Sequence, residues 1–256
     1  MTLSAFAAQR LFVRAPLAAG AGVDLDRDQA NYLVNVLRLK DGDEVLVFNG
    51  DDGEWTARLI AGGRKAWRLA AAALVRGQPA APDLHYLFAP LKQARLDYMV
   101  EKAVEMGAGR LRPVLTAHGQ IARVNRRRME ANAIEAAEQC GILTIPTIDE
   151  PVALADLVGR WAETAGGRRI VFCDEDHSGA DPLSVLAPLE PAPLAVLVGP
   201  EGGFSAAERR LLRAQPFVTA LPLGPRVLRA DTAAVAALAL IQAAIGDWQS
   251  RAPAPH

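Results

Sequence analysis

From about residue 83 onward, short apolar runs alternate with longer segments in which apolar residues recur every three or four positions. The clearest of these stripes predicts a helix that Gly107 ends; its members are Leu96, Met99, Val100, Ala103 and Val104. Five apolar runs are typical of buried strands: residues 84–88, 111–115, 169–173, 194–198 and 218–223. Strands that alternate with helices favour a mostly parallel sheet covered by helices, so the predicted fold class is α/β.

Capping signals predict where further helices begin. Ser205 and Glu208 have the spacing of a capping box, in which the hydroxyl accepts from the amide of Glu208 and the carboxylate accepts in return. Another helix is expected over residues 126–139. Asp231 is the expected N-cap of an apolar helix that extends to residue 245.

The chain before residue 77 has a different pattern, with short strands expected at residues 10–13, 44–48 and 55–60. The loop 49–53 contains two glycines and predicts a hairpin between the last two strands. A short helix is expected from Asp28 to Leu37, with Leu33, Val36 and Leu37 as its buried side. These elements predict a small barrel-like β domain.

The segment Gly-Gln-Pro-Ala-Ala-Pro at residues 77–82 has no periodicity and is typical of a linker. It divides the 256 residues into expected domains at 1–76 and 83–250. Hydrophobic residues make up 51% of the chain, which is typical of a globular protein with a real core. The start shows no signal peptide and no run approaches a membrane span, so we expect a cytoplasmic protein.

The cysteines and the distribution of charge bear on metal binding and RNA binding. Cys140 and Cys173 have no CxxC or Cys/His neighbours, so we expect buried thiols and no metal site. The net charge is -1, yet nine basic residues stand against three acidic ones between His85 and Met129. This excess could bind RNA phosphates, or residues 126–128 could simply be a solvated helix start.

Two segments place glycines and polar residues after predicted strands, where ligands bind in open α/β sheets. Residues 197–205, LVGPEGGFS, have three glycines that let the backbone approach a ligand closely. Residues 221–233, LPLGPRVLRADTA, bring Arg226, Arg229 and Asp231 together. Neither segment has the pattern of a dinucleotide-binding or P-loop motif, which disfavours a nucleotide-binding α/β enzyme. Ordinary strand-to-helix turns remain an alternative for both.

GPEGGFS followed by LGPRVLRADTA resembles the RsmE family of the SPOUT superfamily, the small-subunit ribosomal RNA (uracil-N3)-methyltransferases. Further similar segments are NVLR with GD at residues 35–43, Lys92 with EKAVEMG at 101–107, and EAAEQC at 135–140. The sequence departs from the family pattern at four places. Asn31 stands where a histidine is common, Ile142 and residues 118–120 stand where an arginine is common, and Asp231 stands where a glutamate is usual. The resemblance covers almost the whole chain.

The resemblance implies a PUA-like RNA-binding barrel at residues 1–76 and a SPOUT domain with a trefoil knot at 83–250. It implies a homodimer that uses S-adenosylmethionine to methylate uridine N3 in the decoding region of 16S ribosomal RNA. The cofactor residues it implies are Val198, Gly199, Pro200, Glu201, Gly202, Gly203, Leu223, Gly224, Val227, Leu228, Thr232 and Ala233. The RNA-binding residues are Arg10, Arg38, Lys92, Arg95, Arg123, Arg126, Arg127 and Arg128.

Removal of the uracil N3 proton leaves negative charge on the flanking oxygens, and positioning with electrostatics should dominate catalysis. Arg229 is the candidate that stabilises this charge, and Asp231 is the candidate base or a simple helix cap. Glu201 contacts the ligand or braces its loop. Another RNA or base atom as target, and a non-catalytic RNA-binding assembly factor, are the alternative functions.

Overall fold

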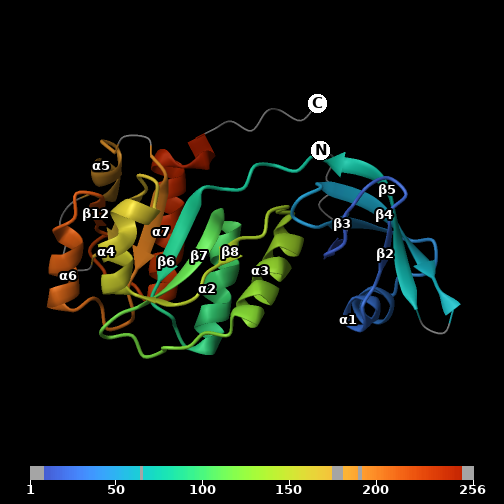
Figure 1. The fold of residues 1–256 in the computed structure, drawn as a ribbon, viewed down its shortest axis with the longest axis horizontal. Coiled ribbons are helices and arrows are strands. Elements are labelled where there is room, and N and C mark those ends of the chain that lie inside the picture. Colours follow the sequence, from blue (N-terminus) through green and yellow to red (C-terminus); the bar gives the residue numbers. More distant parts are fainter. Residues whose placement is uncertain (1–8, 64–65, 175–180, 190–191, 250–256) are drawn as a thin grey trace. The chain divides into compact units, whose positions relative to one another are not determined.

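The computed structural model describes residues 9–63, 66–174, 181–189 and 192–249 (Figure 1). The chain forms two compact units. The first combines Met1–Ala81 with Ile134–Ile145, and the second combines Pro82–Ala133 with Pro146–His256. The sequence pattern assigned residues 134–145 to the second domain, whereas they pack with the first unit. The predicted domain limits 1–76 and 83–250 stay a prediction.

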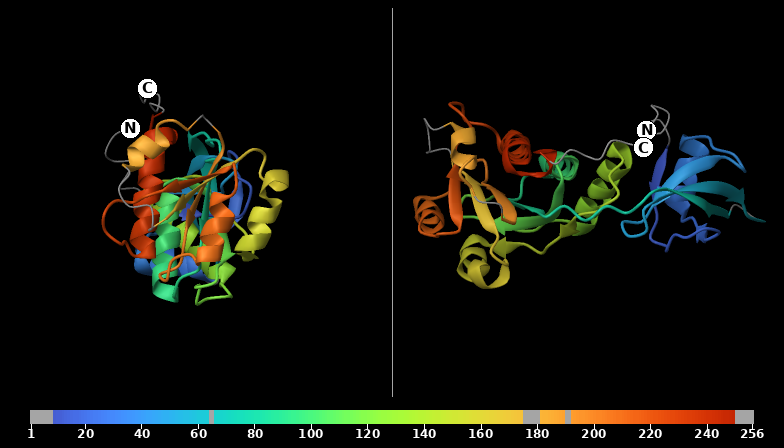
Figure 2. Two further views of the ribbon diagram at one scale, coloured as in Figure 1. Left: turned by 90° about the vertical axis from the view of Figure 1, so that its left-hand side faces the viewer. Right: turned by 90° about the horizontal axis from the view of Figure 1, so that it is seen from above.

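The first unit is built on a curled sheet of five strands in the order β1-β3-β4-β5-β2 (Figure 2). The strands are β1 (Arg10–Phe12), β2 (Gly22–Asp24), β3 (Glu44–Phe48), β4 (Glu54–Ala61) and β5 (Trp67–Arg76). β3 and β4 pair antiparallel across the predicted hairpin, and β1 pairs parallel with β3. Val47, Leu59 and Leu69 are fully buried in its core, as expected for inward-facing residues of alternating strands.

The helix that the sequence predicts from Asp28 begins earlier and is shorter. Asp26 is the N-cap of α1 (Arg27–Asn31), and a π-helical turn, η2 (Tyr32–Val36), follows directly. Val36 was expected in the core and is instead 61% exposed. The π turn is wider than an α-helical turn, so the 3.6-residue stripe on which that expectation rested does not hold here.

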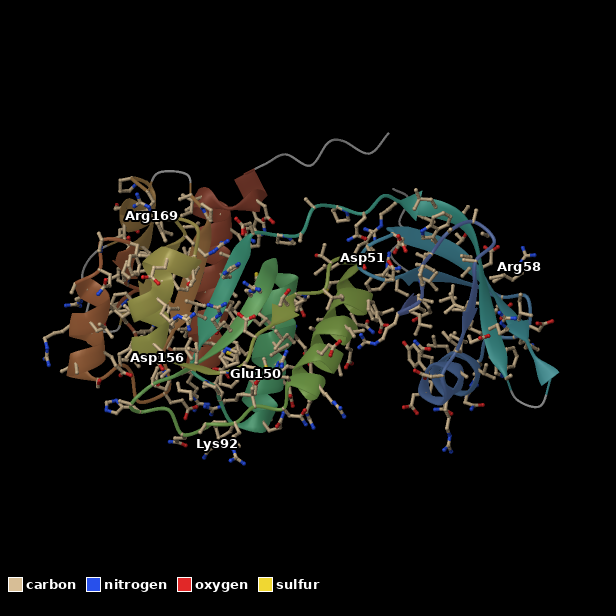
Figure 3. The ribbon with its side chains drawn as sticks, viewed as in Figure 1. Asp51, Arg58, Lys92, Glu150, Asp156 and Arg169 are labelled. Carbon is tan, nitrogen blue, oxygen red and sulfur yellow. The ribbon has the colours of Figure 1, made fainter. Side chains whose placement is uncertain are left out.

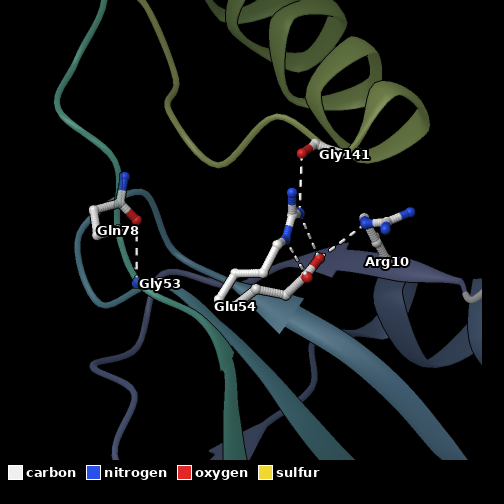
Figure 4. Close-up of polar contacts among 6 residues, drawn as sticks. Arg10, Gly53, Glu54, Gln78 and Gly141 are labelled. Carbon is white, nitrogen blue, oxygen red and sulfur yellow. Dashed lines mark hydrogen bonds and ion pairs between the residues drawn. The ribbon is translucent and has the colours of Figure 1, made fainter. Parts of the chain in front are cut away.

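A buried carboxylate joins the strands of the first unit to residues 134–145 of the same unit (Figure 4). Glu54 accepts hydrogen bonds from Arg10 Nε at 2.8 Å and from Arg76 Nε at 2.7 Å. Arg76 also donates to the carbonyl oxygen of Gly141 at 3.0 Å. The sequence-based role of Arg10 in RNA binding is therefore corrected: its guanidinium is buried in this ion pair and is not part of a binding surface.

The second unit contains a seven-stranded sheet in the order β12-β10-β11-β6-β7-β8, with β9 paired to β7. The strands are β6 (Leu84–Phe88), β7 (Ala108–Leu115), β8 (Thr147–Ile148), β9 (Val152–Ala153), β10 (Arg169–Cys173), β11 (Leu194–Val198) and β12 (Val218–Leu221). All these pairings are parallel. The predicted α/β class is confirmed, and the trefoil knot stays a prediction.

Helices cover both faces of this sheet (Figure 2). The helices of this unit are α2 (Gln93–Glu105), α4 (Leu154–Thr164), α5 (Pro182–Leu186), α6 (Ala206–Arg213), α7 (Ala230–Ile245) and the 3-10 turn η4 (Asp247–Gln249). The residues of α3 (Arg126–Cys140) are divided between the two units. α4 and α6 contact each other on one face, and α7 contacts α2 and α5 on the other. Trp161 of α4 and Leu212 of α6 bury against Leu87, Phe172 and Leu197 of the sheet. This packing fixes the strand ends from which the site is built.

Two local predictions are corrected in the second unit. Arg229 is the N-cap residue of α7, and Asp231, the expected N-cap, lies in the first turn of the helix. Cys140 was expected to be buried and is exposed at the end of α3. The capping box of Ser205 and Glu208 is confirmed, with both reciprocal hydrogen bonds present at the start of α6.

Candidate functional site

A cavity of about 140 Å³ opens at the carboxyl ends of three adjacent strands, β10, β11 and β12. Both glycine-bearing loops line it, as the position of ligands in open α/β sheets predicts. Ten of the predicted cofactor residues face it: Val198, Gly199, Pro200, Glu201, Gly203, Leu223, Gly224, Val227, Leu228 and Ala233. Gly202 lines a smaller neighbouring cleft, and Thr232 lines neither.

The loop after β11 is held in a shape that glycine permits. A Cβ at Gly199 would lie 2.8 Å from the ring of Phe204, too close for any side chain without rearrangement. Phe204 is itself anchored, because it is buried edge-on against Phe172 with 5.9 Å between ring centroids. Gly203 has φ +66°, in the left-handed region that glycine adopts readily. The loop therefore exposes backbone atoms toward the cavity.

A segment after β7 braces the same loop from outside. Nδ1 of His118 lies 3.0 Å from the carbonyl oxygen of Gly202 and 3.2 Å from that of Gly203. The amide of Ala117 donates to Glu208 at 2.8 Å, and Glu208 also accepts from the amide of Ser205. Sequence reasoning noted residues 118–120 only as a departure from the family pattern and assigned them no role.

The loop after β12 forms the opposite wall. Val227 is 85% exposed at the mouth of the cavity, and Arg226 also lines it. Arg229 follows as an exposed residue and Asp231 is half-buried; Oδ1 of Asp231 accepts from the amide of Thr232 at 2.9 Å. Among the described residues, neither Arg226 nor Arg229 forms an ion pair, so both cationic groups remain available to an anionic group.

The end of β10 contributes a carboxylate that the sequence analysis missed. Asp174 is almost fully buried in the cavity wall and pairs with Arg209 at 3.2 Å and Arg213 at 2.7 Å. Burial raises the pKa of the adjacent Cys173 thiol to about 12, so this cysteine is not a nucleophile near neutral pH. Asp174 directly follows the predicted strand 169–173, but the position of this strand between β11 and β12 exists only in the folded sheet.

The predicted RNA-binding residues differ in whether they form ion pairs within the protein. Arg95 pairs with Glu201, Arg126 with Glu150 and Arg128 with Asp97. By contrast, Lys92 (labelled in Figure 3) is exposed, as are Arg123 and Arg127, and none of the three forms an ion pair among the described residues. In the first unit, Arg38 is exposed with φ 59°, a conformation that costs about 1 kcal/mol for a residue with a Cβ. These cationic side chains are the better candidates for RNA contacts.

No group of three or more His, Cys, Asp or Glu side chains in the described part of the chain could hold a metal ion. No helix among these residues is long and apolar enough to cross a lipid bilayer.

A parallel α/β sheet with a ligand cavity between two glycine loops defines a small-molecule-binding α/β unit, here joined to a small β unit. Residues 78–242 match the family model described as RNA methyltransferase domain, so the chain belongs to that family. Residues 25–67 match the model described as RNA methyltransferase PUA domain. The resemblance to the RsmE family found in the sequence is confirmed by these matches and by the relatives below.

Curated relatives carry a single name. Ribosomal RNA small subunit methyltransferase E of Rickettsia conorii is 28% identical over 91% of this chain and 94% of its own length. The protein of the same name from Bacillus subtilis is 26% identical over 84% of this chain and 87% of its own. A methyltransferase of Legionella pneumophila, solved with the bound cofactor SAM, is 28% identical with a TM-score of 0.78, covering 93% of this chain and 98% of its own.

Proposed function

We propose that this protein transfers a methyl group from S-adenosylmethionine to N3 of a uridine in the decoding region of 16S ribosomal RNA. The observation that carries the proposal is the cavity itself: two glycine loops meet there in a chain of the RNA methyltransferase domain family. The curated relatives named as small-subunit methyltransferases support the substrate, and the Legionella protein with bound SAM supports the cofactor.

The residues of the cavity fit S-adenosylmethionine. Val198, Leu223 and Leu228 provide apolar surface for the adenosine, and the backbone of both loops provides hydrogen-bonding groups. The buried carboxylate of Asp174 is paired with Arg209 and Arg213, so it supports the cavity wall. When bound, the cofactor supplies an electrophilic methyl group on a sulfonium sulfur.

The chain's own residues then act on the uracil. N3 takes the methyl group as its proton leaves, so negative charge develops on the two flanking carbonyl oxygens. Arg229 is the candidate that stabilises that charge, because it is exposed and forms no ion pair among the described residues. Asp231 remains the candidate base, with a structural role in the first turn of α7 as the alternative.

The proposal includes a homodimer in the cytoplasm. Most of the apolar surface of α7 is buried inside its own unit, so this helix serves chiefly as core. The homodimer rests on the resemblance to the RsmE family, since the exposed apolar residues Tyr98, Val227 and Trp248 lie on separate elements. Light scattering at micromolar concentration should give twice the mass of the 27.3 kDa chain.

Mass spectrometry of nucleosides from 16S ribosomal RNA tests the function. Cells that lack the gene should lose 3-methyluridine, and the purified protein with S-adenosylmethionine should restore it. Restoration of a methyl group at another atom or in another RNA would replace the proposed substrate. Tight RNA binding with no methyl transfer would instead support an assembly factor.

A further inference from the structure

A shallow cleft lies beside the cofactor cavity at the carboxyl edge of the same sheet. Its walls come from residues 90–92 after β6, from the loop 118–121 after β7, and from residues 200–202 after β11. Pro200 and Glu201 line both the cleft and the cavity, so the two hollows share one wall. Because β11, β6 and β7 are neighbours in the sheet, the cleft is the next place along this edge where a second substrate can lie.

The surface of the cleft combines apolar walls with free polar side chains. Pro90, Leu91 and Ile121 supply apolar surface against which a flat ring can pack. Lys92 and Gln120 are exposed, and among the described residues neither side chain forms a hydrogen bond or an ion pair. The lining thus has unused hydrogen-bond donors and no unpaired carboxylate, since Glu201 pairs with Arg95.

The walls are held in place by contacts already described. His118 donates to the carbonyl oxygens of residues 202 and 203, which ties the β7 side of the cleft to the β11 side. A Cβ at Gly202 would lie 3.2 Å from Cβ of His118, so the two segments are in close contact. The cleft is therefore a built feature of the fold and not a gap between independent loops.

We propose that this cleft binds the uracil base of the target nucleotide, with the ammonium group of Lys92 facing a carbonyl oxygen of the ring. The inference rests on the proposed function. An ammonium group only donates, and uracil presents two carbonyl acceptors that flank N3. Cytosine keeps O2 but presents an amino group in place of O4, so an ammonium group that faces O4 favours uracil. The base must leave its stack to enter, which irregular ribosomal RNA permits.

The test compares Lys92→Met, which removes the charge at similar length, with Lys92→Arg, which keeps a donor. Lys102→Met is the matched control, because Lys102 lies on the same helix, pairs with Glu105 and is outside the cleft. Three quantities are measured: cofactor affinity by calorimetry, affinity for unmodified 16S ribosomal RNA across a salt series, and single-turnover methylation at saturating RNA.

Lys92→Met should lower the single-turnover rate at least tenfold, with unchanged cofactor affinity and an unchanged salt slope. Lys92→Arg should recover most of the rate, and Lys102→Met should behave as wild type. If Lys92→Met instead flattens the salt slope by about 0.7–0.9 at a normal rate, Lys92 is a phosphate contact and the inference is overturned. No change in any quantity also overturns it. If wild-type protein binds cofactor but does not methylate this RNA, the proposed function itself fails and the inference falls with it.

Discussion

His118 holds the glycine loop from a segment 84 residues earlier in the chain. Both of its contacts are to carbonyl oxygens, so Nδ1 must carry the proton and act as the donor. The neutral tautomer with a proton on Nδ1 can donate these hydrogen bonds. Because the contact is exposed, its contribution should be that of an ordinary hydrogen bond, about 1 kcal/mol.

His118→Leu should therefore weaken binding of S-adenosylmethionine about fivefold, since the loop loses its brace. His118→Asn should recover most of the affinity, because the amide nitrogen of Asn can donate from nearly the same place. Calorimetry measures the cofactor affinity of both variants. Arg123→Ala, in the same segment between β7 and α3, is the control. Equal loss in the Leu and Asn variants would show that the hydrogen bonds do not matter.

Arg229 has a different expected role, at the chemical step. Arg229→Ala should bind cofactor and RNA almost as wild type and lower the single-turnover rate 10²-fold or more, as removal of a charge-stabilising donor does elsewhere. A normal rate would exclude the role of Arg229 and make Asp231 the next residue to test.

The basic residues at the start of α3 differ in whether they have an ion-pair partner. Arg128 is held by Asp97, while Arg127 is exposed and forms no ion pair with the described residues. Arg127→Ala should flatten the salt dependence of RNA binding by about 0.7–0.9, and Arg128→Ala should change it less. Equal slopes for both variants and wild type would mean that this face does not contact RNA.

At the scale of elements, strands with a continuous apolar run were predicted to the residue, as with β6, β10 and β11. β5 (Trp67–Arg76) was missed because its row of alanines has no alternation, and α4 was missed because its strong stripe ends in a glycine-rich stretch. The loops of the cavity could be predicted because glycines that directly follow an apolar strand are recognisable in the local sequence. The braces from His118 and Asp174 depend on tertiary contacts, which no local pattern contains.

The loop after β11 offers a direct test of its close packing. Gly199→Val should abolish measurable binding of S-adenosylmethionine, because the new side chain displaces the ring of Phe204 and with it the cavity wall. Gly77→Val is the control, since a Cβ there meets nothing within 4 Å. Circular dichroism checks that both variants fold; undiminished binding by folded Gly199→Val would show that the loop does not form the site.

At the scale of the whole molecule, the first unit carries a buried carboxylate, Glu54, and a half-buried one, Glu138, with opposite pH behaviour. Burial raises the pKa of Glu54, but hydrogen bonds from Arg76 and Arg10 outweigh it, so the net pKa is lowered. Burial raises the pKa of Glu138, which accepts from the amide of Phe12. Ionised Glu54 therefore stabilises the fold above the unfolded-state pKa of about 4.3, and ionised Glu138 opposes it.

Glu54→Gln should lower the free energy of unfolding at pH 7 by about 3–5 kcal/mol, because two guanidinium groups lose their anion. As the pH falls below about 4, the wild-type protein should lose this stabilisation, and the free energies of unfolding of the two proteins should become equal. Glu138→Gln should be neutral or stabilising at pH 7. Denaturant unfolding followed by tryptophan fluorescence measures the stability of wild type and both variants. A constant difference in the free energy of unfolding between Glu54→Gln and wild type down to pH 2 would show that ionised Glu54 is not the stabilising group.

The helix α3 belongs to both units, since its last turns and the residues up to Ile145 pack with the first. This has a consequence for the order of events during synthesis. When residues 1–81 leave the ribosome, the partners of Phe12 and Arg76 at Glu138 and Gly141 do not yet exist. The first unit gains these contacts only after some sixty further residues have been translated, so a fragment cut at the linker should be less stable than the same unit in the full chain.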